Sequence, residues 1–217
     1  MGRDAGAAGA VSDAVVTGGA PGVDAGLGVS GAKRLRADGH PEGIAPAVVV
    51  ITGIMAAGKS TIAQLLAGRL PKAAHVRGDL FRRMIVSGRA DMTPGADEEA
   101  VAQLRLRHRL TAAVADGYAD AGFTAVVQDV LLGDHLDDLL DAVATRPRYL
   151  VVLAPEPAAV AAREANRAKT GYGAWTVEDL DQGLRAMPRR GLWLDSTHLT
   201  PAATVDALLA GLDEAAV

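Results

Sequence analysis

A short glycine-containing segment with one lysine is the most chemically informative part of the sequence. Residues 48–61 read VVVITGIMAAGKST, and from Gly53 they match the pattern G-x-x-x-x-G-K-[ST] at each specified position. In such a loop, backbone N–H groups cradle phosphates, the lysine reaches the β- and γ-phosphates, and the hydroxyl of the next residue binds Mg²⁺. The predicted nucleotide-binding residues are Gly53, Ile54, Met55, Ala56, Ala57, Gly58, Lys59, Ser60 and Thr61.

The motif predicts binding of a nucleoside triphosphate with Mg²⁺. The motif does not separate ATP from GTP, and the lack of a recognised guanine-reading motif does not decide between them. An incidental strand-to-helix turn is the alternative. It is disfavoured because the chain holds only four lysines and because the strand–loop–helix context that the motif requires is also present.

Asp79, in the segment VRGDLFRRM, is a candidate catalytic and substrate-binding residue. It follows an expected strand, so its carboxylate should face the phosphate loop at the carboxyl edge of a parallel sheet. A carboxylate there can accept the proton of a hydroxyl that attacks the γ-phosphate. Asp79 is equally suited to cap a helix N-terminus. The nearby Arg82 is a candidate substrate ligand or a surface residue of the same helix.

Asp129, in the segment VVQDV, is a candidate metal ligand. An acid at the end of this expected strand occupies the place of a Walker B-type residue, which with Ser60 holds Mg²⁺ directly or through water. The alternative is a polar residue that ends a buried strand. No other spacing in the sequence suggests a transition-metal site.

Arg163 and Arg167 lie four residues apart in AAREANRAKTGYGAW, so both should lie on one helical face. Arginines on a mobile lid stabilise the charge of a transferring phosphoryl group and exclude water. We therefore predict a lid around residues 163–175 in which these two arginines are catalytic. The alternative is a solvated helix face. Tyr172 and Trp175 should line a substrate pocket or anchor the lid.

The elements that position these residues alternate between short apolar runs and longer amphipathic ones. We expect strands at residues 47–52, 73–77, 123–130, 148–154 and 191–197. We expect helices at residues 59–70, 78–88, 97–122, 133–146, 156–169, 177–187 and 200–215. Nearly unbroken apolar strands separated by helices indicate a parallel sheet covered on both faces. The predicted fold class is therefore α/β, a P-loop NTPase with a doubly wound five-stranded parallel sheet.

Composition favours one globular domain preceded by a tail. Of the 217 residues, 49% are hydrophobic and only 3% aromatic, so the core should be mostly aliphatic. Residues 1–45 hold 11 of the 25 glycines and no Phe, Tyr or Trp. We expect these residues to form a disordered tail, or to reflect a start site placed too far upstream, and residues 46–217 to form the domain.

The net charge of −4 predicts no general affinity for nucleic acid. The absence of cysteine excludes disulfides and cysteine nucleophiles, and it fits a cytoplasmic protein. The longest apolar run is far shorter than the roughly 20 residues of a membrane span, and no export signal is recognised. We expect a cytoplasmic protein without a membrane partner, and the sequence predicts no oligomeric state.

The phosphate loop, RGDLFRRM, VVQDVLLG, the two lid arginines and GLWLDST together resemble a known family. They resemble small P-loop phosphotransferases of the nucleoside-monophosphate-kinase-like group, specifically the chloramphenicol phosphotransferase-like proteins and their relatives, the zeta toxin kinases. The resemblance runs from about Ala47 to Leu212 and is specific mainly in the phosphate loop. No residues match a chloramphenicol pocket, and the segment from Ser87 to Asp97, where such kinases admit their acceptor, carries no recognisable motif.

The resemblance implies roles for particular residues. It implies that Asp79 activates the acceptor hydroxyl, that Arg163 or Arg167 contacts the nucleotide phosphates, and that the loop from Ser196 to Leu199 lies near the adenine. We therefore expect an ATP- and Mg²⁺-dependent kinase that transfers phosphate to the hydroxyl of a small molecule, such as an antibiotic or a sugar nucleotide. The alternatives are a zeta toxin-like UDP-N-acetylglucosamine kinase and a nucleotide-dependent regulator or ATPase without an acceptor.

Overall fold

The computed structural model describes Ile44, residues 46–166 and residues 172–217. Its strands are β1 (Val48–Gly53), β2 (Ala73–Arg77), β3 (Thr124–Gln128), β4 (Arg148–Leu153) and β5 (Leu192–Leu194). Its helices are α1 (Lys59–Arg69), α2 (Asp79–Met84), α3 (Glu98–Asp120), α4 (Asp134–Ala142), α5 (Pro157–Ala165), α6 (Val177–Arg185) and α7 (Pro201–Ala210). Each expected strand and helix is present, with ends that differ from the sequence prediction by a few residues.

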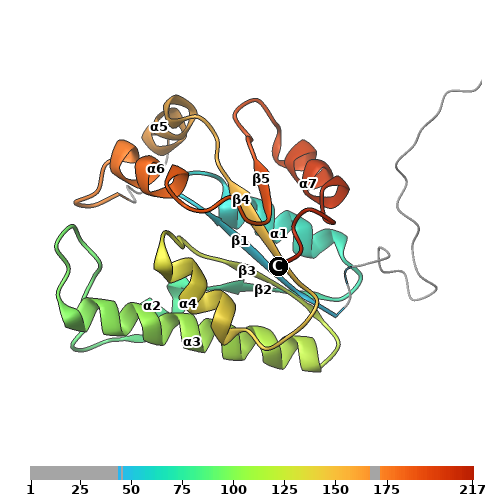
Figure 1. Cartoon of the computed structure of the whole chain (residues 1–217), viewed down its shortest axis with the longest axis horizontal. Coiled ribbons are helices and arrows are strands. Elements are labelled where there is room, and N and C mark those ends of the chain that lie inside the picture. The colour runs from blue at the N-terminus through green and yellow to red at the C-terminus, as the bar shows by residue number, and fades with distance from the viewer. Residues whose placement is uncertain (1–43, 45, 167–171) are drawn as a thin grey trace, which may run out of the picture. The chain divides into compact units, whose positions relative to one another are not determined.

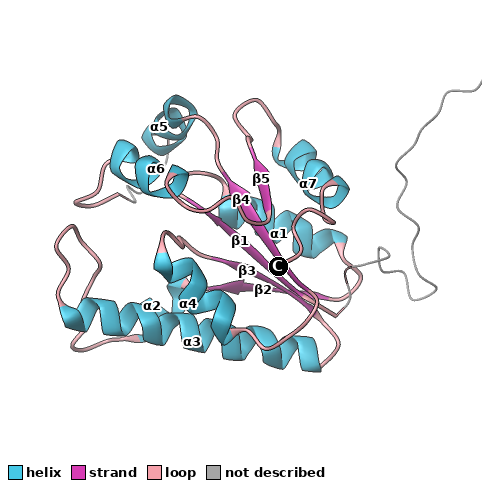
Figure 2. Ribbon diagram, viewed as in Figure 1, coloured by secondary structure: helices cyan, strands magenta, loops and turns pink. Residues whose placement is uncertain are grey.

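The five strands form one parallel sheet in the order β2-β3-β1-β4-β5 (Figures 1 and 2). β1 lies in the centre, where all six of its residues are buried, as expected for a strand that is apolar on both faces. The connection after β1 leads to β2 on one side of the sheet, and the connection after β3 leads to β4 on the other side, so the neighbouring strands β1 and β3 flank a topological switch point. Ligands bind at such a switch point, beyond the carboxyl ends of the strands. The predicted α/β fold with a five-stranded parallel sheet is confirmed.

Helices cover both faces of the sheet. α1 packs with α7 on one face, and α3 packs with α4 on the other (Figure 1). The helices begin where the sequence provides caps: the Asp97 carboxylate accepts the Ala100 N–H at 2.9 Å at the start of α3, and Thr200 does the same for Ala203 at the start of α7. α4 buries Leu136, Leu139 and Leu140, a spacing that forms one apolar face.

The hydrophobic core is aliphatic, as the composition predicted. Its largest fully buried side chains are Ile and Leu, and Tyr149 is the aromatic residue among the buried hydrophobic residues that the structure describes. Each such aliphatic side chain contributes about 1.5–3 kcal/mol by leaving water. Ile44, which precedes the expected start of the domain, is also fully buried, and its carbonyl accepts the Thr124 hydroxyl at 2.8 Å.

The segment after β3 is held against the end of β1. The Thr52 hydroxyl donates to the Leu131 carbonyl at 3.1 Å and accepts the Leu131 N–H at 3.0 Å, and the Asp129 N–H donates to the Ile51 carbonyl. These bonds satisfy buried backbone groups beyond the last ladder pair, so the position of Asp129 is fixed.

Among the described helices, none is long and apolar enough to cross a membrane.

Candidate active site

The phosphate loop connects β1 to α1 and folds back on itself. The Ala57 N–H donates to the Ile54 carbonyl at 3.2 Å, and the Lys59 ammonium donates to the same carbonyl oxygen at 2.8 Å. Lys59 is only 8% exposed, although it is the first residue of α1. Its ammonium therefore lies within the loop at the positive end of the helix dipole, where an anion would complete the electrostatic balance.

Ala56 adopts a left-handed backbone conformation, with φ at 59°. Gly58 also has a positive φ, of 98°. A residue of this kind beside one with right-handed backbone angles turns successive N–H groups towards one concave side, which makes an anion-binding nest. Glycine reaches this conformation without strain, whereas for alanine the left-handed conformation costs about 1–2 kcal/mol of conformational energy. The sequence motif indicated the glycine but gave no sign that Ala56 would be strained.

Asp79 is the first residue of α2, and its carboxylate accepts hydrogen bonds from two arginines of the same helix. Arg82 Nε lies 3.2 Å from one carboxylate oxygen and Arg83 Nε lies 2.7 Å from the other. Partial burial favours the protonated form, but the hydrogen bonds and charges of Arg83 and Arg82 outweigh it and lower the pKa of Asp79. The carboxylate is therefore held ionised.

The helix-cap interpretation of Asp79 is wrong. Gly78 occupies the N-cap position of α2, and no side chain in the described chain makes a capping hydrogen bond there. The arginines compete successfully for the carboxylate because they lie one turn further along the same helix, at spacings of three and four residues. Arg82 also contacts Asp91 at 2.5 Å, so it links α2 to the segment before α3.

Asp129 is buried directly after β3, with a side chain that is 5% exposed. Its Oδ1 accepts Arg107 Nη2 and the Val130 N–H, both at 2.8 Å. Its Oδ2 has no hydrogen-bond partner within the described residues. Burial raises the pKa of Asp129, against the lowering influence of Arg107, the Val130 N–H and Lys59. A buried carboxylate oxygen without a partner is suited to a cation.

Sequence reasoning missed Arg107 and Gly78, both of which act on Asp129. Arg107 lies on α3, 22 residues before Asp129, and no motif links the two. Gly78 lies so close that a Cβ atom there would be 2.1 Å from Asp129 Oδ2. The RGD triplet therefore needs its glycine for space, and this signal was not recognisable without the fold.

Replacing Gly78 with Ala should displace Asp129 and weaken its contact with Arg107. We expect a destabilisation of about 1–3 kcal/mol, as for overpacking of a filled core, and a weaker dependence of activity on Mg²⁺. The matched control is Gly68→Ala in α1, where an added Cβ meets no heavy atom of the described chain within 4 Å. Thermal unfolding of both variants measures the effect, and equal stability of Gly78→Ala and wild type would contradict it.

Arg163 extends from α5 to the loop that follows β5. Its Nη2 donates to the Ser196 carbonyl at 2.7 Å. The same loop is tied to the start of α5, because the Glu156 N–H donates to Thr197 Oγ1 at 2.7 Å. Arg163 thus lies beside the loop from Ser196 to Leu199 that the resemblance placed near adenine. Arg167 lies outside the described residues, as do residues 167–171 of the expected lid and residues 1–43 and 45 of the expected tail.

Tyr172 and Trp175 tie the second half of the expected lid to the site. The Tyr172 hydroxyl donates to the Met55 carbonyl of the phosphate loop at 2.8 Å. The Trp175 indole N–H donates to the Met92 carbonyl at 3.3 Å. Both residues also line a cleft that the phosphate loop shares. They therefore combine the two roles that the sequence left open, anchoring this turn and forming a wall.

The predicted residues meet in one cleft of about 1090 Å³. It is lined by residues of the phosphate loop, α2, α3, β3 and the turn before α6. The predicted site residues among its walls are Met55, Ala56, Gly58, Lys59, Ser60, Thr61, Asp79, Arg82, Asp129 and Arg163. Gly53, Ile54 and Ala57 do not line it, because Ile54 and Ala57 are buried behind the loop and Gly53 ends the central strand.

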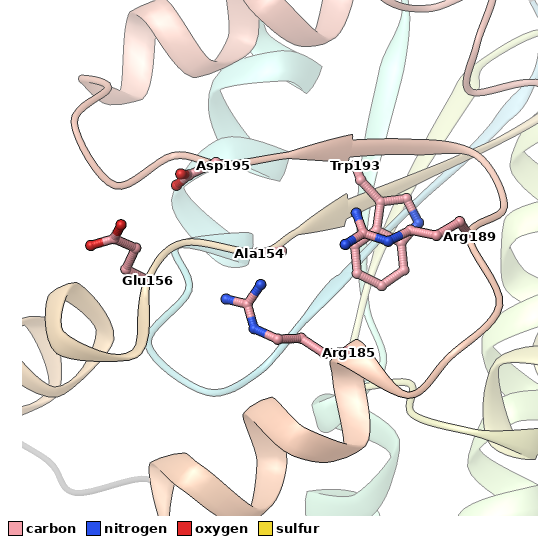
Figure 3. Close-up of a pocket in the computed structure, with 6 residues that line it drawn as sticks. All are labelled: Ala154, Glu156, Arg185, Arg189, Trp193 and Asp195. Carbon is pink, nitrogen blue, oxygen red and sulfur yellow. The ribbon is translucent and has the colours of Figure 1, made fainter.

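A second, smaller hollow of about 320 Å³ shares no lining residue with the cleft (Figure 3). Its walls carry Glu156 and Asp195 on one side, with Arg185 pointing between them and Arg189 lying over the Trp193 ring at 4.2 Å. Arg185 also binds Asp181 at 2.7 Å. The two acidic and two basic side chains balance in formal charge, so the hollow has no net charge of the kind that would select an anion.

Comparison with known proteins identifies a family and a fold. The sequence matches the model of a family described as an AAA domain over residues 48–189. No curated protein matches the sequence. A sugar kinase from Janibacter sp. HTCC2649 is similar in structure, with a TM-score of 0.56 and 21% identity over 78% of this chain and 95% of that one.

Two further solved structures are similar. A gluconokinase from Sinorhizobium meliloti 1021 has a TM-score of 0.53 and 20% identity, over 77% of this chain and 92% of that one. The Mycobacterium tuberculosis APS kinase CysC, in complex with AMPPNP and APS, has a TM-score of 0.60 and 18% identity, over 77% of this chain and 98% of that one. At these identities the similarity shows the fold, which is that of an α/β P-loop NTPase.

Proposed function

This chain belongs to the AAA domain family whose model spans residues 48–189, and we propose that it is an ATP-dependent phosphotransferase acting on a hydroxyl of a small molecule. One observation carries the proposal: an ionised carboxylate, Asp79, lines the same cleft as the phosphate-loop residues Lys59 and Ser60. A carboxylate beside the phosphate site can orient the oxygen that attacks the γ-phosphorus, and in a kinase that oxygen belongs to the acceptor hydroxyl.

In the proposed reaction, the acceptor oxygen forms a bond to the γ-phosphorus while the bond between that phosphorus and the β–γ bridging oxygen breaks. Asp79 orients the hydroxyl and takes its proton. The pKa of Asp79 is lowered, so the carboxylate is a weak base, and the proton moves late, when the new bond has made the hydroxyl acidic. This order fits a loose transition state with little bond formation to the attacking oxygen.

Lys59 and the backbone of the phosphate loop bind the phosphates. The ammonium of Lys59 donates to the Ile54 carbonyl in this structure, so binding requires it to turn from that oxygen to a phosphate oxygen. Arg163 lines the cleft beside the loop after β5 and supplies positive charge there. The walls made by Tyr172 and Trp175 exclude water, which limits transfer of phosphate to water.

Asp129 and Ser60 are the residues that fit a magnesium ion. Asp129 presents its buried, unpartnered Oδ2, and Ser60 presents an exposed hydroxyl that lines the same cleft. Both are oxygen donors, as Mg²⁺ requires. When bound with ATP, Mg²⁺ supplies charge neutralisation of the β- and γ-phosphates. The role of this chain is to fix the two oxygens: Arg107 and the Val130 N–H hold Asp129 through its other oxygen.

The acceptor is proposed to be a small hydroxylated molecule. The similar solved structures are a sugar kinase, a gluconokinase and an APS kinase, and their names support this class. The chloramphenicol phosphotransferase-like group and UDP-N-acetylglucosamine remain specific hypotheses within it.

The decisive experiment measures ADP release and phosphorylated product for purified protein with ATP and Mg²⁺ across a panel of acceptors. The panel holds sugars, sugar acids, nucleosides, sugar nucleotides including UDP-N-acetylglucosamine, and hydroxylated antibiotics. Stimulation by one acceptor, with a product heavier by one phosphoryl group, is expected. ADP release that no acceptor stimulates would instead favour the regulator or ATPase.

Arg163→Ala should lower turnover by about 10²-fold and change ATP affinity much less, since a lid arginine acts mainly on charge that develops during transfer. The matched control is Arg109→Ala, because Arg109 is exposed on α3 and does not line the cleft. Steady-state kinetics and equilibrium ATP binding measure the two effects. Unchanged turnover with weakened ATP binding would show that Arg163 only supports the adenine-side loop.

A further inference from the structure

His108 is a buried histidine whose ring nitrogens lack partners. It lies on the inner side of α3 and is 1% exposed. Neither Nδ1 nor Nε2 has a hydrogen-bond partner among the described residues. A neutral imidazole carries one donor and one acceptor, and leaving both unmade in the interior costs free energy. The proposed phosphotransferase reaction does not use this residue.

Two further ligand-type side chains approach His108 from α4. His135 and Asp138 lie three residues apart, and therefore on one face of that helix. The His135 ring lies 5.9 Å from the His108 ring between centroids. One ligand atom from each of the three residues lies within 4.8 Å of the others. α3 and α4 pack along each other (Figure 1), so the cluster bridges two elements.

We propose that His108, His135 and Asp138 form a binding site for Zn²⁺ between α3 and α4. His135 Nδ1 and Asp138 Oδ2 are already 3.3 Å apart, which is about the separation of two ligands that each lie roughly 2.0–2.1 Å from a tetrahedral ion. The ligand atom of His108 lies within 4.8 Å of the ligand atoms of this pair, and in a closed tetrahedral site it would approach them to a similar separation of about 3.3 Å. Two imidazoles and one carboxylate suit Zn²⁺, whereas Mg²⁺ prefers oxygen ligands.

The surroundings permit this coordination. Burial lowers the pKa of His108 to about 4, with the charge of Arg107 adding to the effect, so the ring is neutral and keeps a lone pair at physiological pH. Arg105 Nε lies 3.5 Å from Asp138 Oδ2. A carboxylate oxygen has two lone pairs, so this contact and a metal bond are compatible.

Three protein ligands leave one position of a tetrahedral ion open. His135 lines the cleft, so the open position lies near the wall of the candidate active site. The ion would crosslink α3 to α4, and α3 is the helix that carries Arg107. The ion site does not depend on the proposed phosphotransferase activity.

The test is Zn²⁺ binding by the untagged full chain without nucleotide, measured by competition with a chromogenic chelator. One ion per chain is expected, together with a rise in melting temperature on addition of Zn²⁺. His135→Ala should weaken binding by at least about 100-fold, since loss of even an outer-shell partner costs 10–100-fold. Asp138→Ala should also weaken it. Both residues are partly exposed, so these variants should fold, unlike changes at His108.

The matched control is His198→Ala, because His198 is exposed in the loop before α7, outside the cluster. It should bind Zn²⁺ as the wild type does. Tetrahedral visible absorption by bound Co²⁺, present in wild type and lost in His135→Ala, gives an independent signature of coordination. Absence of Zn²⁺ binding in the wild type, or equal binding by wild type and His135→Ala, would overturn the proposal.

Discussion

Replacing Asp79 with Asn should lower turnover with the acceptor by about 10²- to 10⁴-fold, which is the usual contribution of a positioned general base. The amide keeps the shape of the side chain but cannot take the proton. ATP affinity should change little, because in the proposed mechanism the phosphate loop, and not Asp79, binds the nucleotide. Steady-state kinetics with the identified acceptor and equilibrium binding of ATP separate the two effects.

The change also removes the negative charge that Arg82 and Arg83 share, so displacement of these arginines must be distinguished from loss of the general base. Asp91→Asn is the matched control, because Asp91 also pairs with Arg82, at 2.5 Å, without contacting Arg83. If Asp79→Asn and Asp91→Asn lower turnover equally and slightly, Asp79 serves to hold arginines and does not act on the hydroxyl.

Lys59→Met should lower turnover by about 10²- to 10³-fold, the usual effect of removing one donor that stabilises transition-state charge. It should also weaken ATP binding, because the ammonium is the cation buried within the phosphate loop. Methionine has a similar length and no charge, so the loop keeps its packing while its electrostatic attraction for phosphate falls.

Lys72→Met provides the matched control for this charge removal. The Lys72 ammonium donates to the Ala121 carbonyl at 2.8 Å and lies over the Phe123 ring, and Lys72 does not line the cleft. Its replacement should leave turnover unchanged. Melting temperatures of both variants show whether either change acts through stability. If the Lys59→Met variant kept normal ATP-dependent turnover, the proposed role of the phosphate loop in the reaction would be wrong.

The strands, the helices and the phosphate loop could be predicted from the sequence alone. Local features depend on residues that are close together in the sequence, so they can be recognised there. They include the apolar run of β1, the apolar face of α4 and the caps at Asp97 and Thr200. The motif around Lys59 can be recognised for the same reason, because one continuous turn of the backbone forms the anion-binding nest. The parallel sheet then followed from the alternation of strands and helices.

Several contacts within the cleft could not be predicted before the packing of the elements was known. Asp79 was ambiguous in sequence because a cap and a free carboxylate use the same residue, and the fold showed its hydrogen bonds with two arginines. Arg107 reaches Asp129 from another helix, and Gly78 is needed because Asp129 Oδ2 occupies the space of its missing Cβ. Such contacts join residues that are distant along the chain, and their energies depend on separations and burial that exist only once the elements have packed.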